Sequence, residues 1–125
     1  MKWTTMAAFV LFWPAVALVT WGELTPHPPL WTAHFWDKSL HFTAYFGLAS
    51  MVTLMFGIRK RTALALVTLA VFGGLLEILQ GFTGRDPDIF DEIANCIGVA
   101  SGFMVALVFI LVLKGRALVE AQARD

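Results

Sequence analysis

Residues 90–113 read FDEIANCIGVASGFMVALVFILVL, and this stretch decides the fold. Its first turns carry Asp91, Glu92 and Asn95, whereas every residue from Ile97 to the end of the stretch is uncharged. A helix needs roughly 20 mostly apolar residues to cross the hydrocarbon core of a bilayer. The stretch therefore predicts a membrane-spanning helix whose polar side chains gather at one end only.

Three further apolar runs occupy about residues 3–21, 37–58 and 62–82. Hydrophobic residues make up 58% of the chain, charged residues 14%, and the mean hydropathy is +0.74. Soluble domains are only ~45–50% apolar and carry ~25% charged residues. We predict an all-α membrane protein, a compact bundle of about four transmembrane helices that forms one domain over residues 1–125. Such spans leave little chain for a soluble catalytic domain.

Lysine and arginine are divided unequally between the two ends of this predicted bundle. One end holds Lys2, Arg59, Lys60, Arg61, Lys114, Arg116 and Arg124. The other end holds only Lys38 and Arg85. Basic residues in short loops favour the cytoplasmic side of a membrane. We therefore predict a multi-pass protein of the cell (inner) membrane whose N- and C-termini are cytoplasmic.

Composition also disfavours several functional classes. The formal net charge is zero, so we predict no nucleic-acid partner. The sequence contains neither a phosphate-binding glycine loop nor a zinc-ligand spacing. Its single cysteine excludes an internal disulfide. The partner that the sequence does predict is the lipid bilayer.

The polar residues of the predicted spans lie at one depth. His41 lies one turn below the start of the second span, and Asn95 lies one turn below the start of the fourth. Glu77 and Gln80 lie within roughly 8 Å of the outer end of the third span, at a rise of ~1.5 Å per residue. Three antiparallel spans therefore place polar side chains in one layer beneath the outer surface. The inner half of the bundle contains no comparable layer.

Helical spacing places these residues on shared faces, because side chains that recur in steps of three or four lie on one side of a helix. The second span presents Asp37, His41 and Tyr45 in this way. The fourth presents Asp88, Asp91, Asn95, Gly98 and Gly102. The glycine pair allows close helix contact. An ionised Glu77 facing lipid would cost ~2.5–3.5 kcal/mol, so we expect it to face the bundle with His41 or Arg85 as its partner.

The same layer offers groups that bind metals or perform acid–base chemistry. His34, Asp37 and His41, together with Glu77, could supply metal ligands, but no short motif fixes such a site and we predict no bound metal. Interfacial belts and lipid contact account for the tryptophans and phenylalanines, so we also predict no pigment, quinone or other cofactor. Whether the protein is an enzyme stays open. Catalysis would have to rest on carboxylates and His41, because the chain has no nucleophile elbow and no Ser/His/Asp arrangement.

Two blocks of sequence carry a family resemblance. The first is Asp37-Lys38-x-x-His41-Phe42-x-x-Tyr45-Phe46. The second is Glu77-x-x-Gln80-x-Phe82-x-Gly84-Arg85-x-x-Asp88-x-x-Asp91-x-x-Ala94-Asn95-x-x-Gly98. In content and order they resemble the VanZ-like family over roughly residues 37–102, and the first span is compatible in position and hydrophobicity. The resemblance implies a compact multi-span membrane protein. The family takes its name from a member associated with resistance to teicoplanin, a glycopeptide antibiotic that acts on lipid-linked cell-wall precursors.

The resemblance also implies a set of site residues. The family's motif positions fall on Asp37, Lys38, His41, Tyr45, Glu77, Gln80, Arg85, Asp88, Asp91 and Asn95. The depth of the polar residues selects the same set. Our leading hypothesis is a cell-envelope protein with an outward-facing polar pocket that engages an amphiphile, with a lipid-linked cell-wall precursor or a lipoglycopeptide as the ligand class.

In this hypothesis Arg85 and Lys38 contact phosphate or carboxylate, while Glu77, Asp88 and Asp91 hydrogen-bond sugar or peptide groups. The alternative is a non-enzymatic accessory subunit that packs against a larger membrane complex. In that case the polar layer is structural and holds the helices in register.

Overall fold

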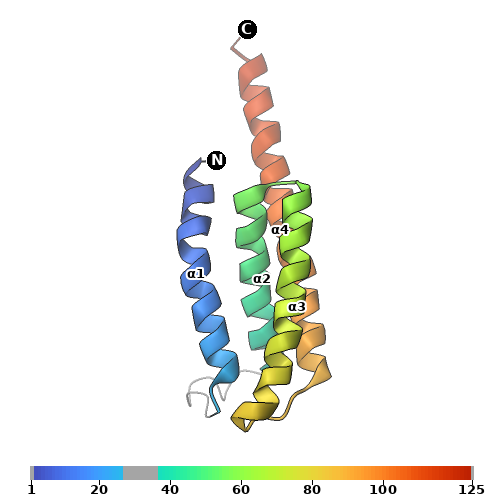
Figure 1. The fold of residues 1–125 in the computed structure, drawn as a ribbon. Coiled ribbons are helices and arrows are strands. Elements are labelled where there is room, and N and C mark those ends of the chain that lie inside the picture. Colours follow the sequence, from blue (N-terminus) through green and yellow to red (C-terminus); the bar gives the residue numbers. More distant parts are fainter. Residues whose placement is uncertain (1, 27–36, 125) are drawn as a thin grey trace.

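The computed structural model describes residues 2–26 and 37–124, and helix is the regular structure throughout these two segments. The chain order is α1 (Lys2–Leu24), α2 (Asp37–Phe56), α3 (Lys60–Thr83) and α4 (Ile89–Gln122). Each helix is long and apolar enough to cross a bilayer. The prediction of an all-α membrane protein with four spans is confirmed, and the fold is that of a multi-pass protein (Figure 1). The former candidate His34 lies outside the described residues.

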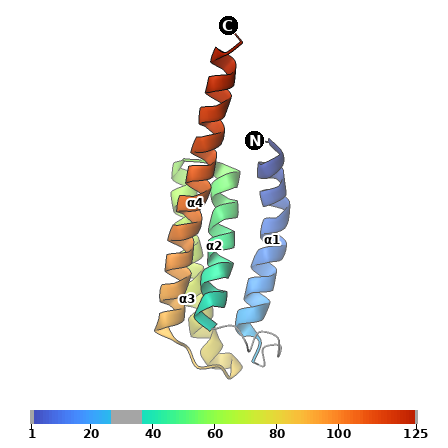
Figure 2. The ribbon, with the colours of Figure 1, turned by 180° about the vertical axis from the view of Figure 1, so that it is seen from behind.

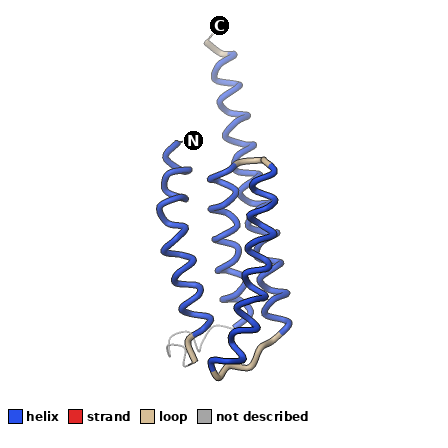
Figure 3. Tube along the Cα trace, viewed as in Figure 1, coloured by secondary structure: helices blue, strands red, loops and turns tan. Residues whose placement is uncertain are grey.

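Two helices are longer than the apolar runs that predict them. α1 continues to Leu24 and so includes Glu23, because the first residue that opposes a helix in this connector is Pro26. α4 continues to Gln122, nine residues past the apolar run, because seven of these nine residues are the good helix formers Lys, Arg, Ala, Leu, Glu or Gln. Its 34 residues measure about 51 Å at ~1.5 Å each. The last turns therefore project beyond the rest of the bundle, as Figure 3 shows.

The helix ends have identifiable local causes. α3 ends at Gly84, whose φ of 87° is a left-handed conformation that glycine adopts without strain. Gly57, with a φ of 66°, follows α2 in the same way. α4 begins at Asp88, whose carboxylate accepts a 2.9 Å hydrogen bond from the Phe90 backbone N–H. The connector at 84–88 is therefore a defined turn that brings its polar side chains back over the bundle.

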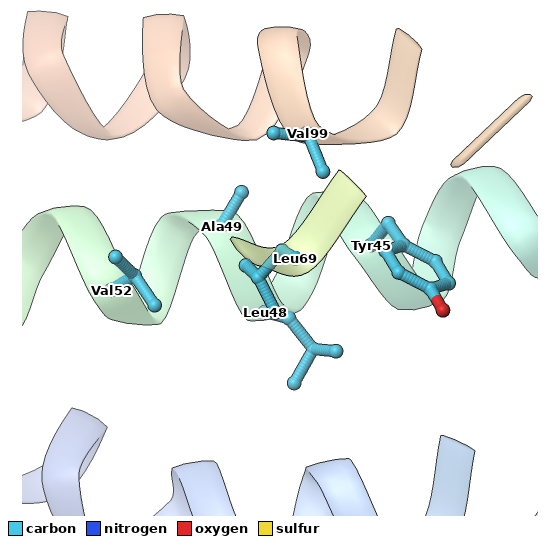
Figure 4. Packing of buried hydrophobic residues seen from close by; sticks show 6 residues of the cluster. All are labelled: Tyr45, Leu48, Ala49, Val52, Leu69 and Val99. Carbon is cyan, nitrogen blue, oxygen red and sulfur yellow. The ribbon is translucent and has the colours of Figure 1, made fainter. Parts of the chain in front are cut away.

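The core lies mainly between α2 and α4, which form the largest helix contact in the described part of the chain. Figure 4 shows its buried cluster, which comprises Tyr45, Leu48, Ala49, Val52, Leu69 and Val99. Gly98 and Gly102 face the α2 backbone so closely that a Cβ on either would collide with the carbonyl oxygen of Phe42 or Phe46. Glycine is therefore required where these two helices touch.

α1 is attached more loosely than the other helices. Its most apolar window is only 6% buried, against 33% for α2, so most of its surface is available to lipid. A cleft of about 380 Å³ separates it from α2 and α3, with Phe12 and Trp13 on one wall and Val52, Met55 and Leu69 on the other. Figures 1 and 2 show α1 beside the compact group of α2, α3 and α4.

Both chain termini lie at one end of the bundle, together with the 57–59 turn (Figure 1). We call this the basic end, because Arg59, Lys60 and Arg61 lie there. The opposite end contains the last turn of α1, the start of α2, the end of α3 and the start of α4. We call it the acidic end, and the polar residues discussed below lie there.

Candidate functional site

The acidic end contains a layer of polar side chains contributed by all four helices. We define the polar layer as Glu23, Asp37, Lys38, His41, Tyr45, Glu77, Gln80, Arg85, Asp88, Asp91, Glu92 and Asn95. Seven members are buried, namely Glu23, His41, Tyr45, Glu77, Gln80, Asp91 and Asn95. The ten residues predicted for the pocket all lie in this layer. Glu23 and Glu92 are the two members that sequence reasoning did not propose.

Lys38 connects the starts of α2 and α4. Its Nζ lies 2.5 Å from Asp88 Oδ2 and 3.0 Å from Asp91 Oδ1. The hydrogen bond from Lys38 is the main reason that the pKa of Asp88 lies below its usual range, and the Phe90 backbone N–H lowers that pKa further. Two carboxylates thus already neutralise this ammonium group.

Arg85 connects the 84–88 turn to α1 and α2. One terminal nitrogen donates to the backbone carbonyls of Gly22, at 3.4 Å, and Glu23, at 3.2 Å. The other lies 3.3 Å and 3.4 Å from the two carboxylate oxygens of Asp37. The sequence analysis predicts phosphate or carboxylate contacts for Arg85 and Lys38. In the structure both side chains have carboxylate partners within the chain, so an external anion must compete with these partners.

His41 is the centre of the buried part of the layer, and oxygen atoms lie near both of its ring nitrogens. Nδ1 lies 3.1 Å from Asn95 Oδ1 and 3.5 Å from a carboxylate oxygen of each of Glu23 and Glu77. Nε2 lies 3.9 Å from Asp91 Oδ2. Of the two partners expected for Glu77, His41 is therefore its neighbour, whereas Arg85 contacts Asp37.

The amide of Asn95 can be oriented from its neighbours. Its Nδ2 lies 3.1 Å from Glu92 Oε2. A carboxylate only accepts hydrogen bonds, so the NH₂ side of the amide must face Glu92. The carbonyl side then faces His41 and accepts a hydrogen bond from Nδ1–H. Together, the two contacts of the Asn95 amide place the proton of a neutral His41 on Nδ1 and leave a lone pair on Nε2.

Several buried polar atoms in the layer have no hydrogen-bond partner among the described residues. They are both carboxylate oxygens of Glu23, Glu77 Oε1, the Tyr45 hydroxyl oxygen and Gln80 Nε2. The Tyr45 hydroxyl and the Glu23 carboxyl group are neighbours, so a small rotation would pair them with each other. The other oxygen of Glu77 accepts a 3.3 Å hydrogen bond from the Asp88 backbone N–H. Buried polar groups are normally paired, because leaving one unpaired costs ~1–3 kcal/mol. The unpaired atoms therefore mark a place where the chain alone does not satisfy its own polar groups.

The polar layer is rich in carboxyl groups. It contains six of them, from Glu23, Asp37, Glu77, Asp88, Asp91 and Glu92, and two fixed cations, from Lys38 and Arg85. One group in the layer has the composition of a metal site, because single ligand atoms of Asp37, His41 and Asp91 lie within 4.8 Å of one another. The layer therefore offers a ligand mainly hydrogen-bond acceptors.

Sequence reasoning missed Glu23 because it assigned this residue to a loop. In the structure Glu23 lies in the last turn of α1 and is 7% exposed. The available signal was that no proline lies between Trp21, where the predicted span ends, and Pro26. Glu92 was passed over because it lies off the stripe of α4 formed by Asp91 and Asn95, although it is three residues from Asn95 and so close enough to contact it.

Comparison with known proteins identifies a family whose model covers these residues. A protein-family model described as VanZ/LLP1 matches residues 3–111, which include the whole polar layer, α2, α3 and most of α1 and α4. Among curated proteins no match is found, and no solved structure matches the chain.

Proposed function

The chain belongs to the VanZ/LLP1 family, and on that premise we propose that its polar layer binds the polar head of an amphiphile in the outer leaflet. A lipid-linked cell-wall precursor or a lipoglycopeptide is the proposed ligand class. The basic end then faces the cytoplasm, because lysine and arginine in short loops favour that side. This orientation makes both termini cytoplasmic and opens the acidic end to the outer surface of the cell (inner) membrane.

The unpaired buried atoms carry this proposal. Three of the five are carboxylate oxygens, belonging to Glu23 and Glu77. Carboxylate oxygens require donors, and the hydroxyl, amide and amine groups of sugars and peptides are donors. We therefore assign the head-group contacts to Glu23 and Glu77. Lys38 and Arg85 hold the walls of the site through their own carboxylate partners.

Access to these atoms requires a movement, since they have almost no exposed surface. α1 is the helix best placed to move, because it is the least buried and the cleft already separates its other half from α2 and α3. At the acidic end it is held by Arg85, which bonds to the carbonyls of Gly22 and Glu23. Displacement of this last turn would expose the carboxylate of Glu77 to a head group, while the ligand's apolar chain stays in the lipid beside α1.

The alternative function also has an observation in its favour. Outside the cleft, α1 carries Trp3, Leu18 and Trp21 on one face, each more than half exposed. An accessory subunit would cover such a face with a helix of a larger membrane complex. In that case Glu23 and Glu77 would hold α1 in register, and no amphiphile would bind.

Binding to purified protein tests the proposal. We would reconstitute the full chain in nanodiscs and titrate it with a polyprenyl-diphosphate-linked disaccharide peptide and, separately, with teicoplanin. Glu77→Gln should weaken binding of the recognised probe about tenfold, equivalent to the ~1.4 kcal/mol of one charge-assisted hydrogen bond. Glu120→Gln, in the exposed end of α4, is the matched control and should bind as the wild type does.

Thermal stability of each variant is measured beside the binding curve. A folded Glu77→Gln protein with wild-type affinity for the recognised probe would remove the polar layer as the binding site. Absence of saturable binding for both probes, with α1 instead cross-linking to another membrane protein in cells, would establish the accessory-subunit function.

A further inference from the structure

We propose that Asp37, His41 and Asp91 bind one divalent transition-metal ion. These residues come from the first turns of α2 and α4, and one ligand atom of each lies within 4.8 Å of the other two. The proposal does not depend on amphiphile binding, and it differs from the expectation drawn from the sequence, where the spacing of His34, Asp37 and His41 provides no recognisable motif.

The orientation of His41 is the first argument. Its Nδ1–H is directed to Asn95 Oδ1, because Glu92 fixes the other side of that amide. Nε2 therefore presents a lone pair toward Asp91, at 3.9 Å from Oδ2. A lone pair facing a carboxylate is repulsive unless a positive charge lies between them. The distance is too long for a hydrogen bond. Two ligands at about 2.1 Å from one ion can be at most ~4.2 Å apart, so an ion fits between these two atoms.

The surroundings of Nδ1 are the second argument. A histidine that binds a metal usually donates its other ring N–H to a carboxylate or carbonyl oxygen, which orients the ring and raises its basicity. His41 has three such oxygens near Nδ1, from Asn95, Glu23 and Glu77. The two glutamates are more than nine-tenths buried, and each directs an unpaired carboxylate oxygen at this imidazole. Hydrogen-bond acceptors beside Nδ1–H raise the basicity of Nε2 and so would strengthen its bond to a cation.

Charge balance is the third argument. The polar layer contains six carboxyl groups and only two fixed cations, Lys38 and Arg85, so little positive charge competes with a divalent ion there. Lys38 occupies only one oxygen of Asp91, namely Oδ1, and leaves Oδ2 for the ion. Asp37 is shared with Arg85 through contacts of 3.3 Å and 3.4 Å, and its side chain is half exposed. It can therefore turn toward the ion and leave a route for the ion from outside.

The ligand atoms indicate the class of metal. Mg²⁺ and Ca²⁺ prefer sites made of oxygen ligands alone. One imidazole nitrogen with two carboxylates instead suits Zn²⁺, Mn²⁺ or Fe²⁺. Three protein ligands also leave a fourth position open on a tetrahedral ion. A water molecule or a ligand oxygen could coordinate there.

Cobalt and zinc titrations of the full chain test the site. The protein is purified in detergent with any oligohistidine tag removed, stripped with EDTA, and titrated with Co²⁺ while visible absorption is recorded. We expect one Co²⁺ per chain, displaced by Zn²⁺. Asp91→Asn and His41→Gln should weaken Co²⁺ binding more than 100-fold. Glu23→Gln should weaken it by the roughly 10–100-fold that loss of a supporting partner costs, with the same stoichiometry.

Asp86→Asn is the control, because Asp86 is an exposed carboxylate in the same connector, outside the polar layer. It should bind Co²⁺ as the wild type does. If His41→Gln fails to fold, Asp37→Asn decides, since its half-exposed side chain is not part of the core. Absence of stoichiometric binding by the wild type, or equal affinity in Asp37→Asn, Asp91→Asn and Asp86→Asn, would overturn the proposal. Neither result concerns amphiphile binding, which is measured separately with EDTA present.

Discussion

α4 and α1 are both long apolar helices, yet they are held in the bundle in different ways. α4 packs on α2 through Gly98 and Gly102, where backbone meets backbone. α1 buries little of its surface and is held by polar contacts near both ends, from Arg85 at the acidic end and from the Thr5 hydroxyl to the Leu54 carbonyl at the basic end. In a bilayer, lipid competes with protein for apolar side chains, so only close packing and polar contacts distinguish the two surfaces. The comparison indicates that α2, α3 and α4 form the rigid part and that α1 is the adjustable part.

The glycine contact should produce the largest effect. Gly102→Leu would force a side chain into the Phe46 carbonyl, and we expect a loss above the ~1–3 kcal/mol typical of overpacking, large enough to prevent folding. The milder pair Gly102→Ala and Gly115→Ala should change stability in opposite directions, since nothing lies near Gly115 and alanine is the better helix former by ~1 kcal/mol. Thermal unfolding in detergent measures all three. Equal stability of the two alanine variants would contradict the close α2–α4 contact.

Much of this comparison could be predicted from the sequence. The four spans and the glycine pattern that allows the α2–α4 contact follow from local spacing and hydropathy, and the family follows from the resemblance of the two polar blocks. The partners within the polar layer do not, because they depend on how helices are rotated against one another. Arg85, for example, was equally compatible with Glu77, and only the fold directs it to Asp37 and the end of α1. Glu23 was missed for a related reason, since hydropathy falls before the helix ends.

Substitution of a buried leucine in α2 and of an exposed leucine in α1 tests whether the two helices are packed equally tightly. Leu48 on α2 is 1% exposed, whereas Leu11 on α1 is 54% exposed. Leu48→Ala should cost about 2 kcal/mol, because the cavity left in the cluster cannot be filled by lipid. Leu11→Ala should cost less than ~0.5 kcal/mol, because lipid replaces the lost contacts. Reversible unfolding of both variants under the same conditions provides the measurement. A cost for Leu11→Ala equal to that of Leu48→Ala would show that α1 is packed as tightly as the core.

The polar contacts between Arg85 and α1 can be removed by a substitution that leaves the apolar surface of α1 unchanged. Arg85→Gln deletes the contacts to Gly22, Glu23 and Asp37, and should cost about 1 kcal/mol, since this side chain is partly solvated. The larger consequence should be increased motion of α1 relative to α3. Spin labels at exposed positions Leu18 and Ile78, in a Cys96→Ser background, should show a broader distance distribution in Arg85→Gln than with Arg85 intact. Identical distributions would mean that packing, and not this arginine, holds α1.

The smallest effect should come from the ion pair at the start of α4, and it should depend on pH. Lys38 and the Phe90 N–H lower the pKa of Asp88, so the folded protein binds this proton less readily than the unfolded chain does. The ionised carboxylate therefore stabilises the fold above its ordinary pKa, and this contribution is lost as the pH falls through the lowered value. Asp88→Asn should remove this part of the acid sensitivity, whereas Asp86→Asn, at an exposed position, should leave it unchanged. Melting temperatures measured from neutral pH down to about pH 3 test the difference, a range that covers the ordinary aspartate pKa. Parallel curves for the wild type and Asp88→Asn would show that Lys38 is held by Asp91 alone, and that the α2–α4 contact depends at this end on one ion pair.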